Sequence, residues 1–285
     1  MIRIGTAGNP DEFYDSGKKS SFEMPAWLKE KGLNAYEYQC GKGVKITQPT
    51  AEKIGAEAEK NGIALSLHSP YFISLSSVEE EKRIKSVDYI MQSLNAAKMM
   101  GAKRVVVHSG SCAKISREEA LNLAKQILTM ALEEQKNNGF EDILLCPETM
   151  GKVNQLGTVD EVLEMCTLSE RLVPCIDFGH INAREYGSLK VFEDFKAITD
   201  KIHDKLGEER GRKFHVHFSR IEFTVPGGEK KHIPYSDTSF GPDFDPFAEL
   251  IVKKNLEPFI ICESPGTQGI DAFTYKTLIE AVKNA

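Results

Sequence analysis

The sequence predicts an α/β protein, a single (β/α)8 TIM barrel that spans residues 1–285 as one domain. Short apolar runs alternate with longer helical stretches, and eight such pairs fit a chain of this length. A third observation is that six of the runs end on or near His, Asp or Glu. The strand candidates are 2–7, 35–39, 64–68, 104–108, 143–148, 173–178, 214–218 and 259–263.

The stretches between these runs carry helix signals. Gly62 and Gly101 are expected to end two helices, and Ser116 with Glu119 has the spacing of a capping box. An open doubly wound sheet is the alternative, but GTAGNP after the first strand does not fit the glycine-rich turn typical of that fold. The helix candidates are 22–31, 50–61, 77–100, 116–137, 158–168, 188–206, 245–255 and 271–284.

Composition indicates an ordinary soluble protein, with 41% hydrophobic and 27% charged residues. The N-terminus, MIRIGTAGNP, lacks the features of a secretory signal, and no apolar run approaches the roughly 18–20 residues that cross a bilayer. We therefore expect a cytoplasmic protein without membrane contact. The six cysteines form no CxxC pair, and we expect reduced, structural thiols. A net charge of −6 disfavours a broad basic surface for nucleic acid but permits a local one.

The metal-binding residue types at the strand ends carry the functional argument. In a barrel these ends and the following loops form one face, so the side chains share one volume. Any one of them alone is more often a hydrogen-bonded core or rim residue, but their joint occurrence predicts a metal site. A mixed set of nitrogen and oxygen donors favours Zn²⁺, Mn²⁺ or Fe²⁺, and the number of donors suits two ions sharing a carboxylate. The candidates are His68, His108, Glu148, Asp177, His180, His217 and Glu263.

Two further expectations concern the seventh strand and the segment after it. We expect His215 and His217 to face opposite sides of that strand, with His217 as the ligand. Residues 219–244 form the longest irregular stretch, and a loop of this length within a compact domain tends to be functional.

Six motifs resemble the endonuclease IV family: HSPYFISL at 68–75, VVVHSGS at 105–111, CPETMG at 146–151, CIDFGHINA at 175–183, HVHFSR at 215–220 and CESPG at 262–266. These follow one another from the third strand to the eighth. The family comprises DNA repair nucleases of the xylose-isomerase-like TIM-barrel superfamily. The resemblance implies a zinc hydrolase that cleaves DNA 5′ to abasic sites in base-excision repair, with abasic DNA as its partner and a monomeric chain.

The resemblance also implies a ligand set for two or three zinc ions, with Mn²⁺ as an alternative. His68 and His108 would hold the first ion and Glu148 would bridge it to the second. The second would be completed by Asp177, His217 and Glu263, and the third would be held by His180 and His232. Glu148 and Glu263 are the expected catalytic carboxylates.

Lys230 stands where the family has an aspartate ligand of the third ion. A lysine ammonium repels a metal cation. Glu229 or Asp237 would then have to supply the missing carboxylate, or Lys230 itself contacts phosphate in place of the third ion. A dinuclear site therefore stays open.

The expected DNA-binding residues are Tyr71, Lys42 and Lys230. The loop CGKGVKITQ carries Lys42 and Lys45 where the family has an arginine-bearing loop. Tyr71 matches a family tyrosine and would wedge into the duplex, which offsets the cost of base flipping. The alternative for Tyr71 is packing on Phe72 at the rim.

Two other functions compete with the nuclease. A sugar isomerase or epimerase of the same superfamily would use one ion held by Glu148, Asp177, His217 and Glu263, with Lys230 or His68 near the substrate. A non-catalytic binding protein is disfavoured, because buried carboxylates crowded together are costly without metal.

Overall fold

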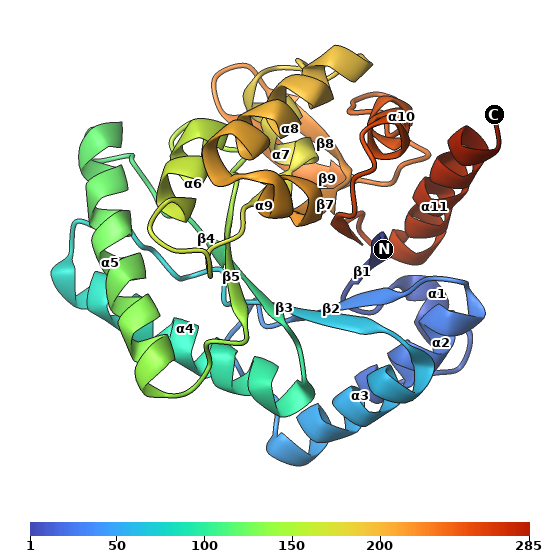
Figure 1. Ribbon diagram of the computed structural model, residues 1–285, viewed down its shortest axis with the longest axis horizontal. Helices are drawn as coiled ribbons and strands as arrows, with labels where there is room; N and C mark the ends of the chain where they lie inside the picture. The colour runs from blue at the N-terminus through green and yellow to red at the C-terminus, as the bar shows by residue number, and fades with distance from the viewer.

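The computed structural model describes all 285 residues and contains a closed barrel of parallel strands surrounded by helices (Figure 1). Residues of the first strand pair with the last, so the sheet has no free edge. The barrel strands are β1 (Arg3–Ala7), β2 (Ala35–Gln39), β3 (Ala64–His68), β4 (Arg104–His108), β5 (Leu144–Glu148), β6 (Cys175–Asp177), β7 (His215–Phe218) and β10 (Phe259–Cys262). Their order around the barrel is β1-β10-β7-β6-β5-β4-β3-β2.

The longer helices lie at the predicted places, although α4, α8 and α11 begin at Glu80, Phe192 and Gln268 rather than at 77, 188 and 271. Gly62 and Gly101 follow α3 and α4 in the left-handed conformation, and the Ser116 hydroxyl accepts a hydrogen bond from the Glu119 amide at the start of α5. The helices are α1 (Asp11–Asp15), α2 (Met24–Glu30), α3 (Gln48–Asn61), α4 (Glu80–Met100), α5 (Arg117–Asn137), α6 (Val159–Cys166), α7 (Phe178–Arg184), α8 (Phe192–Leu206), α9 (Glu208–Lys213), α10 (Asp245–Lys253) and α11 (Gln268–Asn284), with a 3₁₀ turn, η1, at Ser21–Glu23.

The expectation of an irregular segment at 219–244 is wrong for its first half. An antiparallel hairpin, β8 (Arg220–Thr224) and β9 (Gly228–Ile233), follows β7. Its register shifts between Glu222 and Phe223, which pair with Lys231 and Glu229, so Lys230 is the extra residue of a bulge. The sequence GEKKH does not indicate a strand, because the side chains at the solvent-facing positions of β9 are polar or charged.

The hairpin is attached to the loop after β5. The Glu229 amide donates to the Gly151 carbonyl at 3.1 Å, and the Val153 amide donates to the Gly227 carbonyl at 3.2 Å. A Cβ at Gly228 would lie 2.3 Å from the Gly151 oxygen, so this close approach of two backbones requires glycine. The hairpin is thereby held over the end of the barrel at which β5 and β6 finish.

Buried aromatic rings fill the space between β7 and the helices α7, α8, α10 and α11. The Phe178 and Phe247 ring centroids lie 4.5 Å apart, and those of Phe218 and Phe244 lie 4.9 Å apart. Tilted and edge-to-face rings at such distances add to the hydrophobic stabilisation of the core. This aromatic layer supports the strand and the helix that carry His217 and His180.

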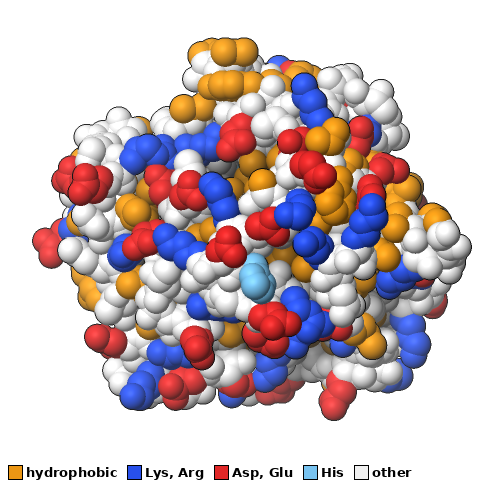
Figure 2. Space-filling view, turned by 45° about the horizontal axis from the view of Figure 1, so that its top comes forward, with side chains coloured by type: hydrophobic (Ala, Val, Ile, Leu, Met, Phe, Trp, Pro, Cys, Tyr) orange, Lys and Arg blue, Asp and Glu red, His pale blue; other side chains and the backbone are white.

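The face of the molecule drawn in Figure 2 carries charges of both signs. On the face drawn in Figure 2, Lys and Arg side chains alternate with Asp and Glu, and no broad patch of one sign is visible. All six cysteines are free thiols, and Cys112 alone among them is not buried. None of the helices has both the length and the apolar character that a membrane crossing demands.

Truncation of the aromatic layer should destabilise the fold. We expect Phe247→Ala to lower the free energy of unfolding by about 3–5 kcal/mol, since the fully buried ring would leave a cavity. Urea denaturation followed by circular dichroism measures the change. Phe273→Ala removes a half-exposed ring and should shift stability by no more than about 0.5 kcal/mol. Equal losses for both variants would contradict the assignment of Phe247 to the core.

Candidate metal centre

The strand-end residues meet at the C-terminal mouth of the barrel, as the parallel topology requires. His68, His108, Glu148 and Asp177 are the last residues of their strands. His217 lies within β7, and His180 lies in the first turn of α7. Glu263 directly follows β10, and Glu229 and His232 lie on β9.

Glu148 is the centre of the cluster. Its Oε2 atom lies 3.4 Å from His68 Nε2 and 3.3 Å from His108 Nε2. Its Oε1 atom lies 3.0 Å from His217 Nδ1. The carboxylate is buried, so four imidazoles, including that of His180 at 3.5 Å, replace the water that would otherwise solvate it.

A second group surrounds the same carboxylate. The side-chain donor atoms of Glu148, Asp177, His217 and Glu263 all lie within 4.8 Å of one another. Asp177 is fully buried, whereas Glu263 is partly exposed and opens the group to solvent. Three carboxylates around one histidine form a donor set of mixed nitrogen and oxygen, which suits Zn²⁺ or Mn²⁺.

A third group consists of His180, Glu229 and His232, whose donor atoms also lie within 4.8 Å of one another. Glu229 Oε2 lies 3.5 Å from His180 Nε2. In a regular strand Glu229 and His232 would face opposite sides, but the bulge at Lys230 turns both toward His180. Of the two carboxylates considered from the sequence, Glu229 lies in this group, while Asp237 is exposed and accepts from the Ser239 amide.

Most of these rings are fixed through their other nitrogen. His68 Nδ1 lies 2.9 Å from the Ser69 carbonyl, His180 Nδ1 lies 2.9 Å from the Thr149 carbonyl, and His232 Nδ1 lies 2.8 Å from the Ser219 hydroxyl. A carbonyl can only accept, so Nδ1 of His68 and His180 carries a proton, and Nε2 is the nitrogen left to bind a metal ion. This arrangement is typical of metal-binding histidines.

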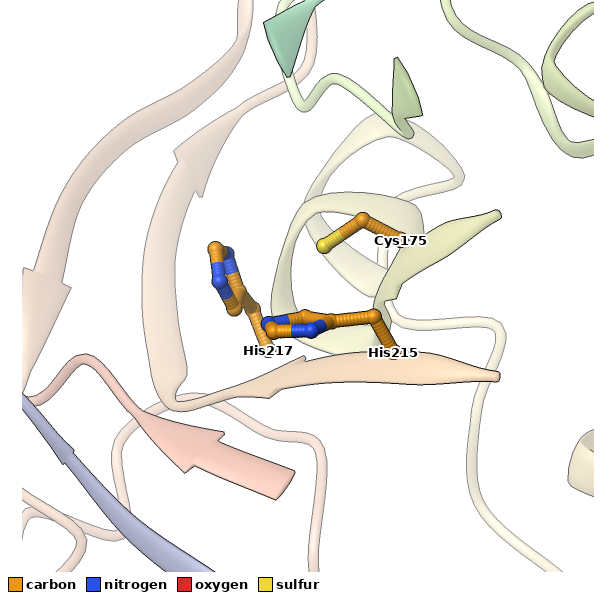
Figure 3. Close-up of side chains that lie close together, drawn as sticks. All are labelled: Cys175, His215 and His217. Atoms are coloured by element: carbon orange, nitrogen blue, oxygen red, sulfur yellow. The ribbon is translucent and has the colours of Figure 1, made fainter. Parts of the chain in front are cut away.

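Below the mouth lies a polar layer that the sequence did not reveal. Glu37, on β2, is fully buried, with His217 Nε2 3.1 Å from its Oε1 atom and His215 Nε2 3.1 Å from its Oε2 atom. The expectation that His215 and His217 face opposite sides is wrong, because residues two apart on a strand share a face. Figure 3 shows both rings on β7 with the Cys175 thiol close to them. The alternation of β2 could have indicated that Glu37 points inward.

The electrostatics of the cluster fit a metal centre. Glu148 Oε2 and Asp177 Oδ2 are buried without a hydrogen-bond partner, which leaves lone pairs for a cation. Burial alone would raise the pKa of Glu148, but the histidines, His217 foremost, outweigh it and hold that pKa well below its usual value. Burial alone would lower the pKa of His68, but the nearby carboxylates, Glu148 foremost, together outweigh it and raise that pKa to about 9. Protons on the imidazoles thus balance the carboxylates where metal ions would.

The expected DNA-binding residues lie outside this cluster. Tyr71 is 62% exposed, and its amide donates to the Gly41 carbonyl, which joins its loop to that of the exposed Lys42. The centroids of the Tyr71 and Phe72 rings lie 5.6 Å apart. The position of Tyr71 therefore fits both a wedge into the duplex and packing on Phe72 at the rim. Lys230 pairs with Glu222 on the outer side of the hairpin and does not take the place of a third cation.

Comparison with known sequences identifies the family. A model described as xylose isomerase-like TIM barrel matches residues 25–285, and the chain belongs to this family. It is 32% identical to an uncharacterized protein of Methanocaldococcus jannaschii over 265 residues, 93% of this chain and 92% of the relative. It is 24% identical to a protein of Shouchella clausii named "Probable endonuclease 4" over 219 residues, 73% of this chain and 72% of the relative. The resemblance to endonuclease IV is confirmed as homology.

Solved structures confirm the barrel. Endonuclease IV from Thermus thermophilus superimposes with a TM-score of 0.72 at 19% identity, covering 98% of this chain and 99% of that one. A D-tagatose 3-epimerase-like protein superimposes with a TM-score of 0.74 at 18% identity, covering 99% of both chains. At these identities the likeness shows a shared fold, and the two neighbours differ in the reactions their names describe.

Metal uptake should release protons. The pKa of about 9 for His68 and for His180 means that both rings are protonated at neutral pH in the metal-free protein. Zinc affinity, measured by competition with a chromophoric chelator, should rise as pH increases from 7 toward 9 and then level off. An affinity independent of pH across this window would contradict the assignment of these rings as ligands.

The same shifts predict how the metal-free protein responds to pH. Because the folded-state pKa values lie above the ordinary value of 6.5, the stabilisation from these two histidines is complete below pH 6.5 and is lost as pH rises through about 9. Thermal unfolding across this range measures the loss. The zinc-loaded protein should not lose stability over this pH range, because the metal ions replace the protons.

Proposed function

We propose that the chain is a zinc-dependent phosphodiesterase of the endonuclease IV type, which cleaves DNA 5′ to abasic sites in base-excision repair. The observation that carries the proposal is the third ligand group, His180, Glu229 and His232, beside the two groups centred on Glu148. A single ion is enough for an isomerase or epimerase. Separate ions that clamp the attacking and leaving oxygens are typical of phosphate-cleaving enzymes.

The charges of the mouth support bound cations. Glu148, Asp177, Glu229 and Glu263 would repel an anionic phosphodiester if no cations were present. When bound, divalent ions supply Lewis acidity and an activated water at neutral pH. In the proposal His68, His108 and Glu148 would hold one ion, and Glu148 together with Asp177, His217 and Glu263 would hold another. Two or three zinc ions fit, and Mn²⁺ is an acceptable substitute.

Glu148 and Glu263 are the catalytic carboxylates of the proposal and act differently. Glu148 is buried among imidazoles, and its negative charge fixes the positions of the rings around it. Glu263 is partly exposed at the rim, where solvent and substrate arrive together. In the proposal the Glu263 carboxylate takes up a proton from the attacking water.

Recognition of the abasic site is assigned to the rim. Tyr71 projects into solvent from the loop after β3, and a base-sized aromatic wedge there would help to hold an extruded nucleotide. Lys42 lies on the adjoining loop and would contact a backbone phosphate. Lys230 would do the same from the hairpin after leaving Glu222.

A sugar isomerase or epimerase is the second candidate. The observation in its favour is the group Glu148, Asp177, His217 and Glu263, which could hold a single ion without any contribution from the hairpin. Under this alternative the third group would be idle. Metal stoichiometry therefore separates the two functions.

The third group should hold an ion of its own. We expect Glu229→Gln to lower the zinc content by one ion per chain, because an amide is a poor ligand that cannot balance the cation. Elemental analysis of the dialysed protein measures it. The matched control is Glu222→Gln, which breaks the ion pair with Lys230 on the outer side of the hairpin and should leave the zinc content unchanged. A full complement in Glu229→Gln would remove the basis of the proposal.

The activity follows from the same assignment. The zinc-loaded protein should nick a duplex containing one tetrahydrofuran abasic analogue on its 5′ side and leave the intact duplex uncut. Loss of a residue that only orients a metal ligand typically lowers metal affinity or activity about 10–100-fold. His108→Ala removes a direct ligand of the proposed centre and should therefore lower the cleavage rate by at least about 100-fold. Epimerisation of a ketose by protein holding one ion, without nicking, would establish the second candidate instead.

A further inference from the structure

The histidines of the mouth differ in what fixes their second nitrogen. For His68 and His180 the partner is a backbone carbonyl, and for His232 it is a serine hydroxyl. All three partners are neutral. For His217 the group at Nε2 is the carboxylate of Glu37, 3.1 Å away. Of these four histidines, His217 is the one whose second nitrogen faces a charged group.

Glu37 is built into the barrel to stay in place. The Ser66 hydroxyl donates to Glu37 Oε2 at 2.8 Å, and the side-chain amide of Gln39 donates to Glu37 Oε1 at 3.1 Å. His215 Nε2 lies 3.1 Å from Oε2, on the side away from the mouth. Both Glu37 and Ser66 are fully buried, so no water competes for the carboxylate.

The His217 ring is held between two sets of carboxylates. Its Nδ1 atom faces Glu148 Oε1 at 3.0 Å and Glu263 Oε1 at 3.5 Å, and its Nε2 atom faces Glu37. The contact with Glu37 lacks the angle of a good hydrogen bond, and Nε2 has no other hydrogen-bond partner. At this distance in a buried site, a ring N–H is still strongly attracted to a carboxylate.

We propose that Glu37 is a positioning residue of the metal centre, which keeps the proton of His217 on Nε2 and thereby presents the Nδ1 lone pair to the ion shared with Glu148, Asp177 and Glu263. A carboxylate behind a ligating imidazole also makes the ring a stronger donor. Glu37 touches neither substrate nor metal and acts through His217 alone. This inference rests on the proposed metal-dependent function.

The test is the metal affinity of Glu37→Gln, which keeps the size of the side chain but removes its charge. The affinity of the ion bound through His217, measured by zinc titration against a competing chelator, should fall about 10–100-fold. The ions of the other two groups should bind as in the parent. Glu37→Asp retains the charge and should recover part of the affinity, which a role in packing alone would not explain.

A matched control separates positioning from stability. Asp271 is also a buried carboxylate, and it accepts hydrogen bonds from the Tyr235 amide and the Thr267 hydroxyl away from any metal-binding group. Asp271→Asn is the equivalent isosteric change, and it should leave all metal affinities unchanged. Nitrogen-15 spectra of the zinc-loaded parent should show His217 bound through Nδ1 with a proton on Nε2.

Three results would overturn the inference. Parent-like affinities in Glu37→Gln would show that Glu37 does not position His217, even though the metal centre exists. Coordination through Nε2 in the spectra would do the same. A thiolate-to-metal absorption band in the Co²⁺-loaded protein would show that Cys175, His215 and His217 hold an ion themselves (Figure 3). A parent protein that binds no metal would instead refute the proposed function.

Discussion

The ionised carboxylate of Glu148, held at the barrel mouth among four imidazoles, is the interaction around which this structure is organised. Such a charge is tolerated without water only if cations or protonated rings surround it. The closed parallel barrel meets this need, because it brings the ends of β3, β4, β5, β6 and β7 to one point. The histidines then lie close enough to Glu148 for either protons or metal ions to supply the positive charge.

Much of the barrel could be predicted because its signals are local. Seven of the eight strand candidates differ from the observed strands by at most one residue at either end: 2–7, 35–39, 64–68, 104–108, 143–148, 214–218 and 259–263. The run at 173–178 is longer than β6, since Phe178 already begins α7, where the Asp177 carboxylate accepts from the His180 amide. The short helices α1, α7 and α9 escape prediction from sequence because helices of 5–7 residues carry too little periodicity.

The site was predictable in its residue types but not in all of its connections. His68, His108, Glu148, Asp177, His217 and Glu263 follow apolar runs and could be named from position alone. Glu37 does not follow from that rule, because it lies in the middle of β2 rather than at its end, and only the alternation of side chains along the strand indicates that it points inward. The role of Glu229 depends on a bulge in the hairpin, which is a property of pairing between two segments rather than of either one.

The hairpin has a consequence for the number of metal ions that a barrel of this kind would hold in the proposed centre. Glu229 and His232 are both carried by β9, an insertion between β7 and the next barrel strand, while every other member of the cluster belongs to the barrel strands or to the residues that directly follow them. In the proposed metal centre, gain or loss of this one insertion would therefore change the number of ions without disturbing the barrel. One barrel framework would then serve reactions that need one ion as well as reactions that need several, with the loop insertion alone making the difference.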